Sequence, residues 1–166
     1  NCTISSQFIS ALLLIAPTLS GGLTIDLQGN LVSKSYLEMT LKMMSYFGIE
    51  YSWKSQTIYI KEQQYQAKDI CIENDWSAAT FWLEIAALAK KAQIELNELY
   101  KDSWQGDIKA LSIFSKFGVS HRFNNNQLIL FKDTNQIPKK QLNLIETPDL
   151  SQAICCTYAG LQQSVE

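Results

Sequence analysis

An internal repeat limits the possible folds of this chain more than any other feature. The tripeptide Phe47-Gly48-Ile49 returns as Phe117-Gly118-Val119, an offset of 70 residues (117 minus 47). At the same offset Ile58-Tyr59-Ile60 falls on Leu128-Ile129-Leu130, in one register without gaps. Such self-similarity is typical of proteins built from copies of one supersecondary unit. We therefore predict two successive copies of an α/β unit.

Each copy is predicted to contain the same elements in the same order: an apolar helix, a strand, an amphipathic helix and a closing hairpin. In the first amphipathic helix, Leu37, Leu41 and Met44 recur at spacings of three and four, which makes one apolar face. The predicted ranges are 5–17, 23–27, 34–47 and 49–60 in the first copy, and 76–90, 93–96, 106–117 and 119–131 in the second.

A third copy is predicted to begin with a strand over Leu142–Ile145 and a helix over Leu150–Leu161, opened by Thr147-Pro148-Asp149. The first copy keeps only Asn1–Ile4 of such an opening strand. Because each unit needs a neighbour to cover its apolar helix face, we expect more copies in the complete protein. The predicted fold class is α+β, made of α/β repeats.

Composition and charge exclude several classes of protein. Hydrophobic residues make up 46% of the chain and charged residues 18%, which is enough for a buried core. The net charge is −2 and the one arginine is Arg122, so we expect no nucleic-acid partner. The apolar run Phe8–Pro17 is shorter than the ~20 residues of a membrane span, and no basic segment of a signal peptide precedes it.

The four cysteines are Cys2, Cys71, Cys155 and Cys156, and their spacing does not suit zinc. We predict that the adjacent pair Cys155 and Cys156 are reduced thiols in a core. This usage indicates a reducing compartment.

The helix starts are where we expect chemistry, because unpaired N–H groups and about half a positive charge suit a phosphate or carboxylate there. Ser5-Ser6-Gln7 opens the first helix with two hydroxyls and an amide. Asp75 and Asp149 stand at the corresponding places in the other copies, where an aspartate would cap the helix and repel an anion. Spacing alone favours the simpler interpretation that all three starts are helix caps.

Two other positions allow both a structural and a functional interpretation. Ser33 is expected to cap the amphipathic helix of the first copy, and Tyr36 either faces a cleft or packs on a neighbour. His121 is a single histidine in a hairpin strand, where a structural role is the expectation.

Together these motifs resemble a known family, the EPSP synthases (3-phosphoshikimate 1-carboxyvinyltransferases). Ser5-Ser6-Gln7-Phe8 is similar to the family motif SSQ[FY], and Val32–Tyr36 is similar to VSKPY. Asn74–Ala79, Gln105-Gly106-Asp107 and Thr147-Pro148-Asp149 resemble later family segments, in the family order. The resemblance covers the whole chain.

The resemblance implies a fold of two domains, each made of three βαβαββ units, with the active site between them. Residues 1–72 would be the last unit of one domain, and residues 73–166 would begin the other. It implies an enzyme that transfers the enolpyruvyl group of phosphoenolpyruvate to the 5-hydroxyl of shikimate 3-phosphate, in aromatic amino acid biosynthesis. No metal or organic cofactor is implied, and the complete enzyme is expected to be cytoplasmic and monomeric, with no membrane partner.

Six residues at matching positions would contact substrate: Ser5, Ser6, Gln7, Ser33, Tyr36 and Asp149. By family analogy the first two serines would bind the phosphate of shikimate 3-phosphate, and the third serine and the tyrosine would help to hold that substrate. The glutamine would touch both substrates, and the aspartate would contact the attacking hydroxyl as its base.

The chain departs from the family pattern at Ser35, which replaces a proline, and at Asn74, which replaces a glycine. The family also holds its anionic substrates with several arginines and lysines, whereas Arg122 is the one arginine here. We therefore expect the isolated chain to be catalytically inactive and to bind substrate weakly.

Two alternatives stay open. One is the related transferase that acts on UDP-N-acetylglucosamine, which shares the repeat fold but whose substrate lacks the sugar monophosphate that Ser5-Ser6-Gln7 would hold. The other is a non-catalytic repeat module that displays a binding surface.

Overall fold

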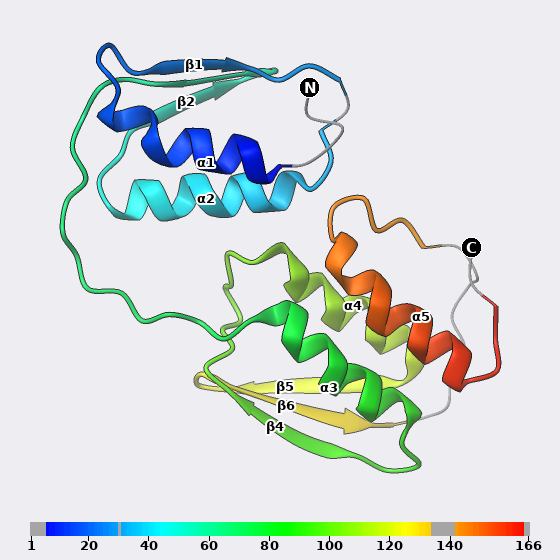
Figure 1. The fold of residues 1–166 in the computed structure, drawn as a ribbon. Helices are drawn as coiled ribbons and strands as arrows, with labels where there is room; N and C mark the ends of the chain where they lie inside the picture. The colour runs from blue at the N-terminus through cyan, green and yellow to red at the C-terminus, as the bar shows by residue number, and fades with distance from the viewer. Residues whose placement is uncertain (1–5, 30, 134–141, 165–166) are drawn as a thin grey trace. The chain divides into compact units, whose positions relative to one another are not determined.

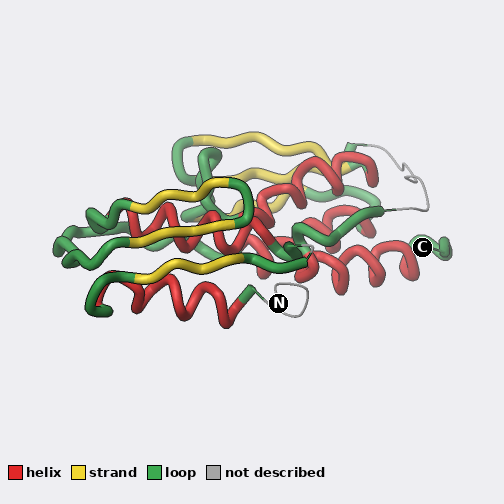
Figure 2. Tube along the Cα trace, turned by 90° about the horizontal axis from the view of Figure 1, so that it is seen from above, coloured by secondary structure: helices red, strands yellow, loops and turns green. Residues whose placement is uncertain are grey.

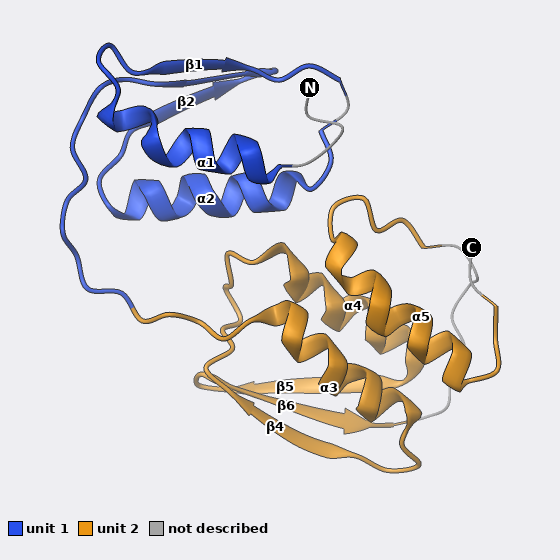
Figure 3. Ribbon diagram, in the orientation of Figure 1, with its two compact units in different colours: residues 1–70 blue, residues 71–166 orange. Residues whose placement is uncertain are grey.

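The computed structural model describes residues 6–29, 31–133 and 142–164. The chain divides into two compact units, Asn1–Ile70 and Cys71–Glu166, which are coloured separately in Figure 3. Each unit has its own hydrophobic core.

Unit 1 is a three-stranded antiparallel sheet with two helices on one face (Figure 1). Its elements are α1 (Gln7–Ile15), η1 (Ala16–Thr18), β1 (Leu23–Asp26), α2 (Lys34–Tyr46), β2 (Tyr51–Lys54) and β3 (Thr57–Ile60). The strand order is β1-β3-β2, and both outer strands are antiparallel to β3, so they are parallel to each other. The two helices each lead back to one of these parallel strands. They therefore run in the same direction and begin at the same end of the unit.

The core of unit 1 forms where the apolar face of each helix meets the sheet. Leu37 and Leu41 of α2 are fully buried, as the spacing predicts, and Ile58 and Ile60 of β3 alternate with the exposed Tyr59. The alternation follows from the period of two along a strand, which puts every second side chain on the helix-covered face.

Unit 2 repeats this arrangement and adds one more helix (Figures 1 and 2). Its sheet has the order β4-β6-β5, the same topology as in unit 1. Helices α3, α4 and α5 lie on one face of it. The predicted α+β repeat is therefore confirmed. The elements are α3 (Trp76–Leu88), β4 (Gln93–Asn97), η2 (Gly106–Lys109), α4 (Ala110–Phe114), η3 (Ser115–Phe117), β5 (Val119–Asn124), β6 (Gln127–Lys132), η4 (Pro148–Leu150) and α5 (Ser151–Gly160).

The hairpins of the two units match at the predicted offset of 70. Trp53 pairs with Ile58 in unit 1, and Phe123 pairs with Leu128 in unit 2. The glycine before each hairpin is left-handed, with φ of 87° at Gly48 and 79° at Gly118, so it ends the preceding helix as predicted.

The prediction of one register without gaps was wrong for the strand that precedes each amphipathic helix. Leu23 pairs with Ile60, but the residue that pairs with Leu130 is Ile94, an offset of 71 (94 minus 23). An additional residue, Glu98, follows β4 with a positive φ of 53°. The alternation in burial carries this shift, because at an offset of 70 the half-buried Leu23 would fall on the exposed Gln93, whereas at 71 it falls on the half-buried Ile94.

Two predicted elements differ in the structure. The helix expected over 106–117 is divided into η2, α4 and η3, and its first residues Gly106 and Asp107 are poor helix formers. The strand expected over Leu142–Ile145 does not form. Instead Leu142 and Leu144 pack against the core of unit 2, so this segment contributes apolar surface rather than sheet hydrogen bonds.

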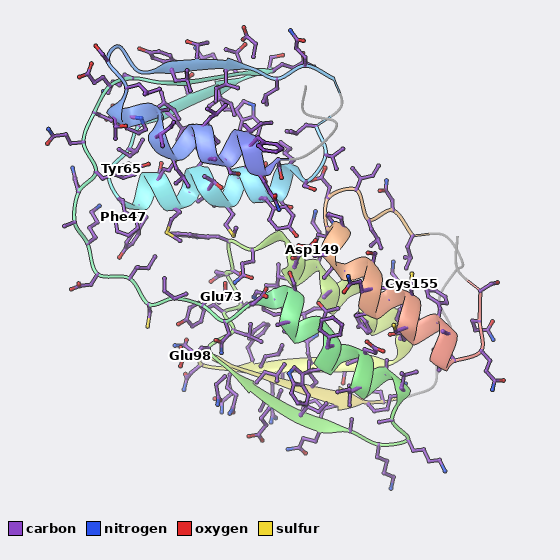
Figure 4. The ribbon with its side chains drawn as sticks, viewed as in Figure 1. Phe47, Tyr65, Glu73, Glu98, Asp149 and Cys155 are labelled. Carbon is purple, nitrogen blue, oxygen red and sulfur yellow. The ribbon has the colours of Figure 1, made fainter. Side chains whose placement is uncertain are left out.

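The prediction that Cys155 and Cys156 lie in a core was also wrong, because both thiols are exposed and free. Helix α5 buries its opposite face, through Ala153, Ile154, Thr157 and Tyr158. A helix of 3.6 residues per turn that buries these positions must turn the two residues between them outward. Cys155 is labelled on α5 in Figure 4.

Within the described part of the chain, no helix reaches the length and apolarity that crossing a membrane requires.

Candidate functional site

The start of α1 holds two of the predicted site residues. Ser6 is the N-cap residue and is 6% exposed, but its hydroxyl makes no cap hydrogen bond to the helix. Gln7 is the first helical residue and is exposed. Ser5 lies outside the described residues, as does the short opening segment Asn1–Ile4.

The start of α2 holds two more of the predicted site residues, Ser33 and Tyr36. Ser33 stands at the predicted N-cap position, yet its side chain also makes no cap hydrogen bond. Its backbone is left-handed, with φ of 58°, and the residue is 7% exposed. A serine in this conformation is uncommon, and such backbone strain is concentrated at functional sites. Tyr36 follows in the first turn, half-buried, and its N–H donates to the Ser33 carbonyl at 3.1 Å.

The structure places both helix starts at the same end of unit 1, because α1 and α2 run in parallel and pack against each other. Leu13, Leu37 and Leu41 fill the space between the helices and the sheet. Two positive helix ends, with Ser6, Gln7, Ser33 and Tyr36 on them, thus point in one direction. This arrangement favours an anion.

The equivalent helix start in unit 2 is closed by the chain's own side chains. As predicted, Asp75 caps α3: its Oδ1 accepts the Ser77 N–H at 2.8 Å. The Gln105 Oε1 accepts the preceding N–H, that of Trp76, at 2.9 Å. Since these acceptors occupy N–H groups of the first turn, this start of α3 is satisfied internally, and an anion there would meet a carboxylate.

Glu73 is a residue whose importance the sequence did not indicate. Its Oε1 accepts the Trp76 Nε1–H and the Tyr100 N–H, both at 2.8 Å. Its Oε2 accepts the Ser103 hydroxyl at 2.6 Å and the Gln105 side-chain amide at 3.1 Å. One carboxylate therefore joins the entry into α3 to the loop after β4, the region of Glu73 and Glu98 in Figure 4. Because its partners lie up to 32 residues away, no local motif could have revealed it.

Asp149 belongs to unit 2, whereas the other described site residues belong to unit 1. It is exposed and lies in the first turn of η4. The prediction that it caps the helix was wrong, because the N-cap of η4 is Thr147 and that of α5 is Leu150. The short η4 turn comes first, so α5 begins at Ser151, one residue after the predicted start at Leu150.

Three other features were considered as candidate sites: His121, a groove beside α2 and clusters of metal-binding side chains. His121 lies edge-on to the Phe123 ring, with centroids 5.8 Å apart, and burial lowers its pKa below the usual 6.5. A groove of about 900 Å³ beside α2 is lined by Lys34, Lys42 and Trp53, among others, and by none of the predicted site residues that the structure describes. Over the described ranges, no cluster of three or more His, Cys, Asp or Glu side chains could hold a metal ion.

Comparison with known proteins identifies what the chain is similar to. The family model described as EPSP synthase (3-phosphoshikimate 1-carboxyvinyltransferase) matches residues 1–165. A 3-phosphoshikimate 1-carboxyvinyltransferase of Bacteroides fragilis (strain YCH46) is 39% identical over 159 residues, covering 95% of this chain and 39% of that protein. Proteins of the same name from Methanosphaera stadtmanae and Idiomarina loihiensis are 36% and 35% identical, covering 94% and 92% of the chain. The chain spans 38% and 36% of these two relatives, so it corresponds to less than half of each.

Proposed function

Because this chain belongs to the EPSP synthase family, we propose that it forms part of an enzyme that transfers an enolpyruvyl group. The donor would be phosphoenolpyruvate and the acceptor the 5-hydroxyl of shikimate 3-phosphate. The products would be 5-enolpyruvylshikimate 3-phosphate and phosphate, on the route to aromatic amino acids. The relatives bear the name of the enzyme acting on 3-phosphoshikimate, which favours this substrate over UDP-N-acetylglucosamine.

One observation carries the proposal: both helices of unit 1 begin at the same end, and neither N-cap side chain closes its helix. In this proposal Ser5 and Ser6 bind the phosphate of shikimate 3-phosphate at the positive end of α1, and Ser33 and Tyr36 hold the same substrate from α2. A phosphate accepts hydrogen bonds from hydroxyls and helix N–H groups and gains from the helix dipoles. The start of α3 does not suit such a role, because Asp75 and Gln105 already accept hydrogen bonds from its first N–H groups.

Two residues would carry the transfer itself. Gln7, exposed at the first position of α1, would donate through its amide to both substrates. The Asp149 carboxylate would accept the proton of the 5-hydroxyl as its oxygen bonds to C2 of phosphoenolpyruvate and the methylene carbon takes up a proton. Loss of phosphate from C2, together with one proton from that carbon, would then restore the double bond. Fixed dipoles and hydrogen-bond donors around the two anions supply the rest of the stabilisation.

The proposal also covers the place of the chain in the complete enzyme. Residues 1–72 would be the last unit of one domain, and residues 73–166 would open the other. The enzyme would work in the cytoplasm as a monomer, with small molecules as its partners and no cofactor. The chain alone would not turn substrate over, because the basic residues that hold the anions in the family are missing from it.

The test is an NMR titration of the chain with shikimate 3-phosphate, with shikimate as the matched ligand that lacks the phosphate. We expect amide shifts confined to Ser5–Gln7, Ser33 and Tyr36 with the phosphorylated ligand and much smaller shifts with shikimate. The start of α3 is the internal control, because Asp75 and Gln105 already occupy its N–H groups. Equal shifts at Trp76 and Ser77, or no shifts at unit 1, would overturn the proposed site.

A further inference from the structure

A pair of hydroxyls links the two helices of unit 1 one turn behind the proposed phosphate-binding residues. The Thr40 Oγ1 of α2 lies 3.2 Å from the Ser10 Oγ of α1 and 2.9 Å from the Tyr36 carbonyl oxygen. Ser10 and Thr40 are both half-buried, and the core of unit 1 that includes Leu13, Leu37 and Leu41 is otherwise apolar. Apolar contacts of this kind tolerate sliding, whereas a hydrogen bond fixes two atoms at one distance.

The pair is connected to the site on both sides. The N–H of Ser10 donates to the Ser6 carbonyl at 2.9 Å, so this serine is one helical turn from the start of α1. Thr40 donates to the carbonyl of Tyr36, whose N–H in turn donates to the Ser33 carbonyl at 3.1 Å. A continuous path of short contacts thus runs from one helix start to the other.

The corresponding positions of unit 2 hold no such hydroxyl pair, and its helices are joined differently: the Ser77 hydroxyl of α3 donates to the Asp107 Oδ2 of η2 at 2.6 Å. At the offset of 70, Ser10 corresponds to Thr80 and Thr40 corresponds to Ala110. The Thr80 hydroxyl donates to its own helix, to the Trp76 carbonyl at 2.9 Å, and Ala110 has no polar side chain. The hydroxyl pair therefore occurs in the unit whose helix starts lack side-chain caps, and is missing from the unit whose start of α3 is closed.

We propose that Ser10 and Thr40 are positioning residues for the anion site. They fix the distance and rotation of α1 against α2, and thereby hold Ser6 and Ser33 at the separation that one phosphorylated ligand requires. Neither hydroxyl touches the ligand. This inference rests on the proposed function, and it adds residues that act through others rather than on the substrate.

The variants Thr40→Val and Ser10→Ala test it, with Thr80→Val as the matched control. Each of the two threonine changes removes a hydroxyl that donates to the carbonyl four residues earlier, but only Thr40→Val breaks a link between helices. We expect the Kd for shikimate 3-phosphate, from NMR titration, to rise about fivefold in Thr40→Val and in Ser10→Ala. Thr80→Val should leave it unchanged. Thr40→Ser keeps the hydroxyl and should restore binding.

Two readouts separate a positioning role from a loss of stability. The double variant should bind no more weakly than either single variant, because both break the same link. Amide exchange at Ser10 and Tyr36 should become faster in Thr40→Val and stay unchanged in Thr80→Val, with or without ligand. Unchanged affinity and exchange in Thr40→Val would overturn the positioning role while leaving the site intact. Failure of the unsubstituted chain to bind shikimate 3-phosphate would instead overturn the proposed anion site of unit 1 and this inference with it.

Discussion

At the scale of single residues, Glu73 shows how one carboxylate can hold a unit together. It accepts four hydrogen bonds, from the indole of Trp76, the backbone of Tyr100 and the side chains of Ser103 and Gln105. A carboxylate without a proton only accepts, so its two oxygens suit four donors. A replacement of Glu73 that introduces a hydrogen-bond donor would therefore place two donors against each other.

Glu73→Gln is therefore expected to destabilise unit 2 by about 2 kcal/mol, because the new amide N–H₂ faces two donors in either orientation. Urea denaturation followed by tryptophan fluorescence would measure the change. Glu95→Gln is the control, since it makes the same change on an exposed residue of β4 and should cost less than about 0.5 kcal/mol. Equal losses in the two variants would contradict the role assigned to Glu73.

His121 predicts a dependence of stability on pH. Burial lowers its pKa in the folded chain, so the unfolded chain takes up the proton at higher pH. The free energy of unfolding is therefore not reduced by His121 above the unfolded pKa of about 6.5. It decreases as the pH falls through 6.5 towards the lower pKa of the folded chain. His121→Gln should remove this part of the dependence. The measurement is the free energy of unfolding of both proteins between pH 5 and pH 8. If the two plots of free energy against pH are parallel, His121 does not contribute to the pH dependence.

At the scale of elements, the two first helices differ in how they begin, and the sequence revealed only part of the difference. The cap by Asp75 was predictable, because a carboxylate at that place reaches an N–H two residues on. The contribution of Gln105 was not, because it comes from 29 residues away and depends on the folded loop. The left-handed Ser33 was not predictable either, because serine normally avoids that conformation.

Helix-start variants should follow this difference. Asp75→Ala removes a cap hydrogen bond and is expected to cost about 1 kcal/mol, measured by thermal unfolding. Ser6→Ala removes a hydroxyl that makes no cap hydrogen bond, and is expected to cost less than about 0.5 kcal/mol while weakening the binding of shikimate 3-phosphate. The two variants thus separate a helix cap from a ligand-binding serine. A stability loss in Ser6→Ala as large as that in Asp75→Ala would contradict the distinction.

At the scale of the whole molecule, the repeat was predictable because hairpins and glycine caps are local features that recur with their residues. The segment that joins the two units was not, because its partners lie far away in the sequence. Tyr65 donates its hydroxyl to the Leu14 carbonyl at 2.8 Å, and the N–H of Gln66 donates to the Phe47 carbonyl at 2.8 Å (Figure 4). These contacts make the stretch after β3 part of unit 1.

These hydrogen bonds also predict where a protease should cut the chain first. Tyr46 holds the carbonyl of Asp69 from unit 1, and on the other side the N–H of Asn74 donates to the Glu98 carbonyl at 2.8 Å within unit 2. Between these anchors lies Ile70–Ile72, where Ile72 is 71% exposed. A brief digestion with a protease of broad specificity should therefore cut first within residues 70–72, and mass spectrometry should detect two resistant pieces.

Tyr65→Phe provides the comparison for this cleavage pattern. This variant removes the hydroxyl that donates to the Leu14 carbonyl and keeps the aromatic ring. The segment 61–69, called the strap below, therefore loses one hydrogen bond to α1 and little packing. Cleavage should then spread towards residues 61–69, while the boundary near Glu73 stays where it was, because its anchors are in the other unit. Early cuts scattered through residues 61–69 in the unsubstituted chain would show that the strap is not held as the hydrogen bonds indicate. Confinement of the cuts to 70–72 in both proteins would assign the clamping to the backbone contacts of Gln66 rather than to the tyrosine.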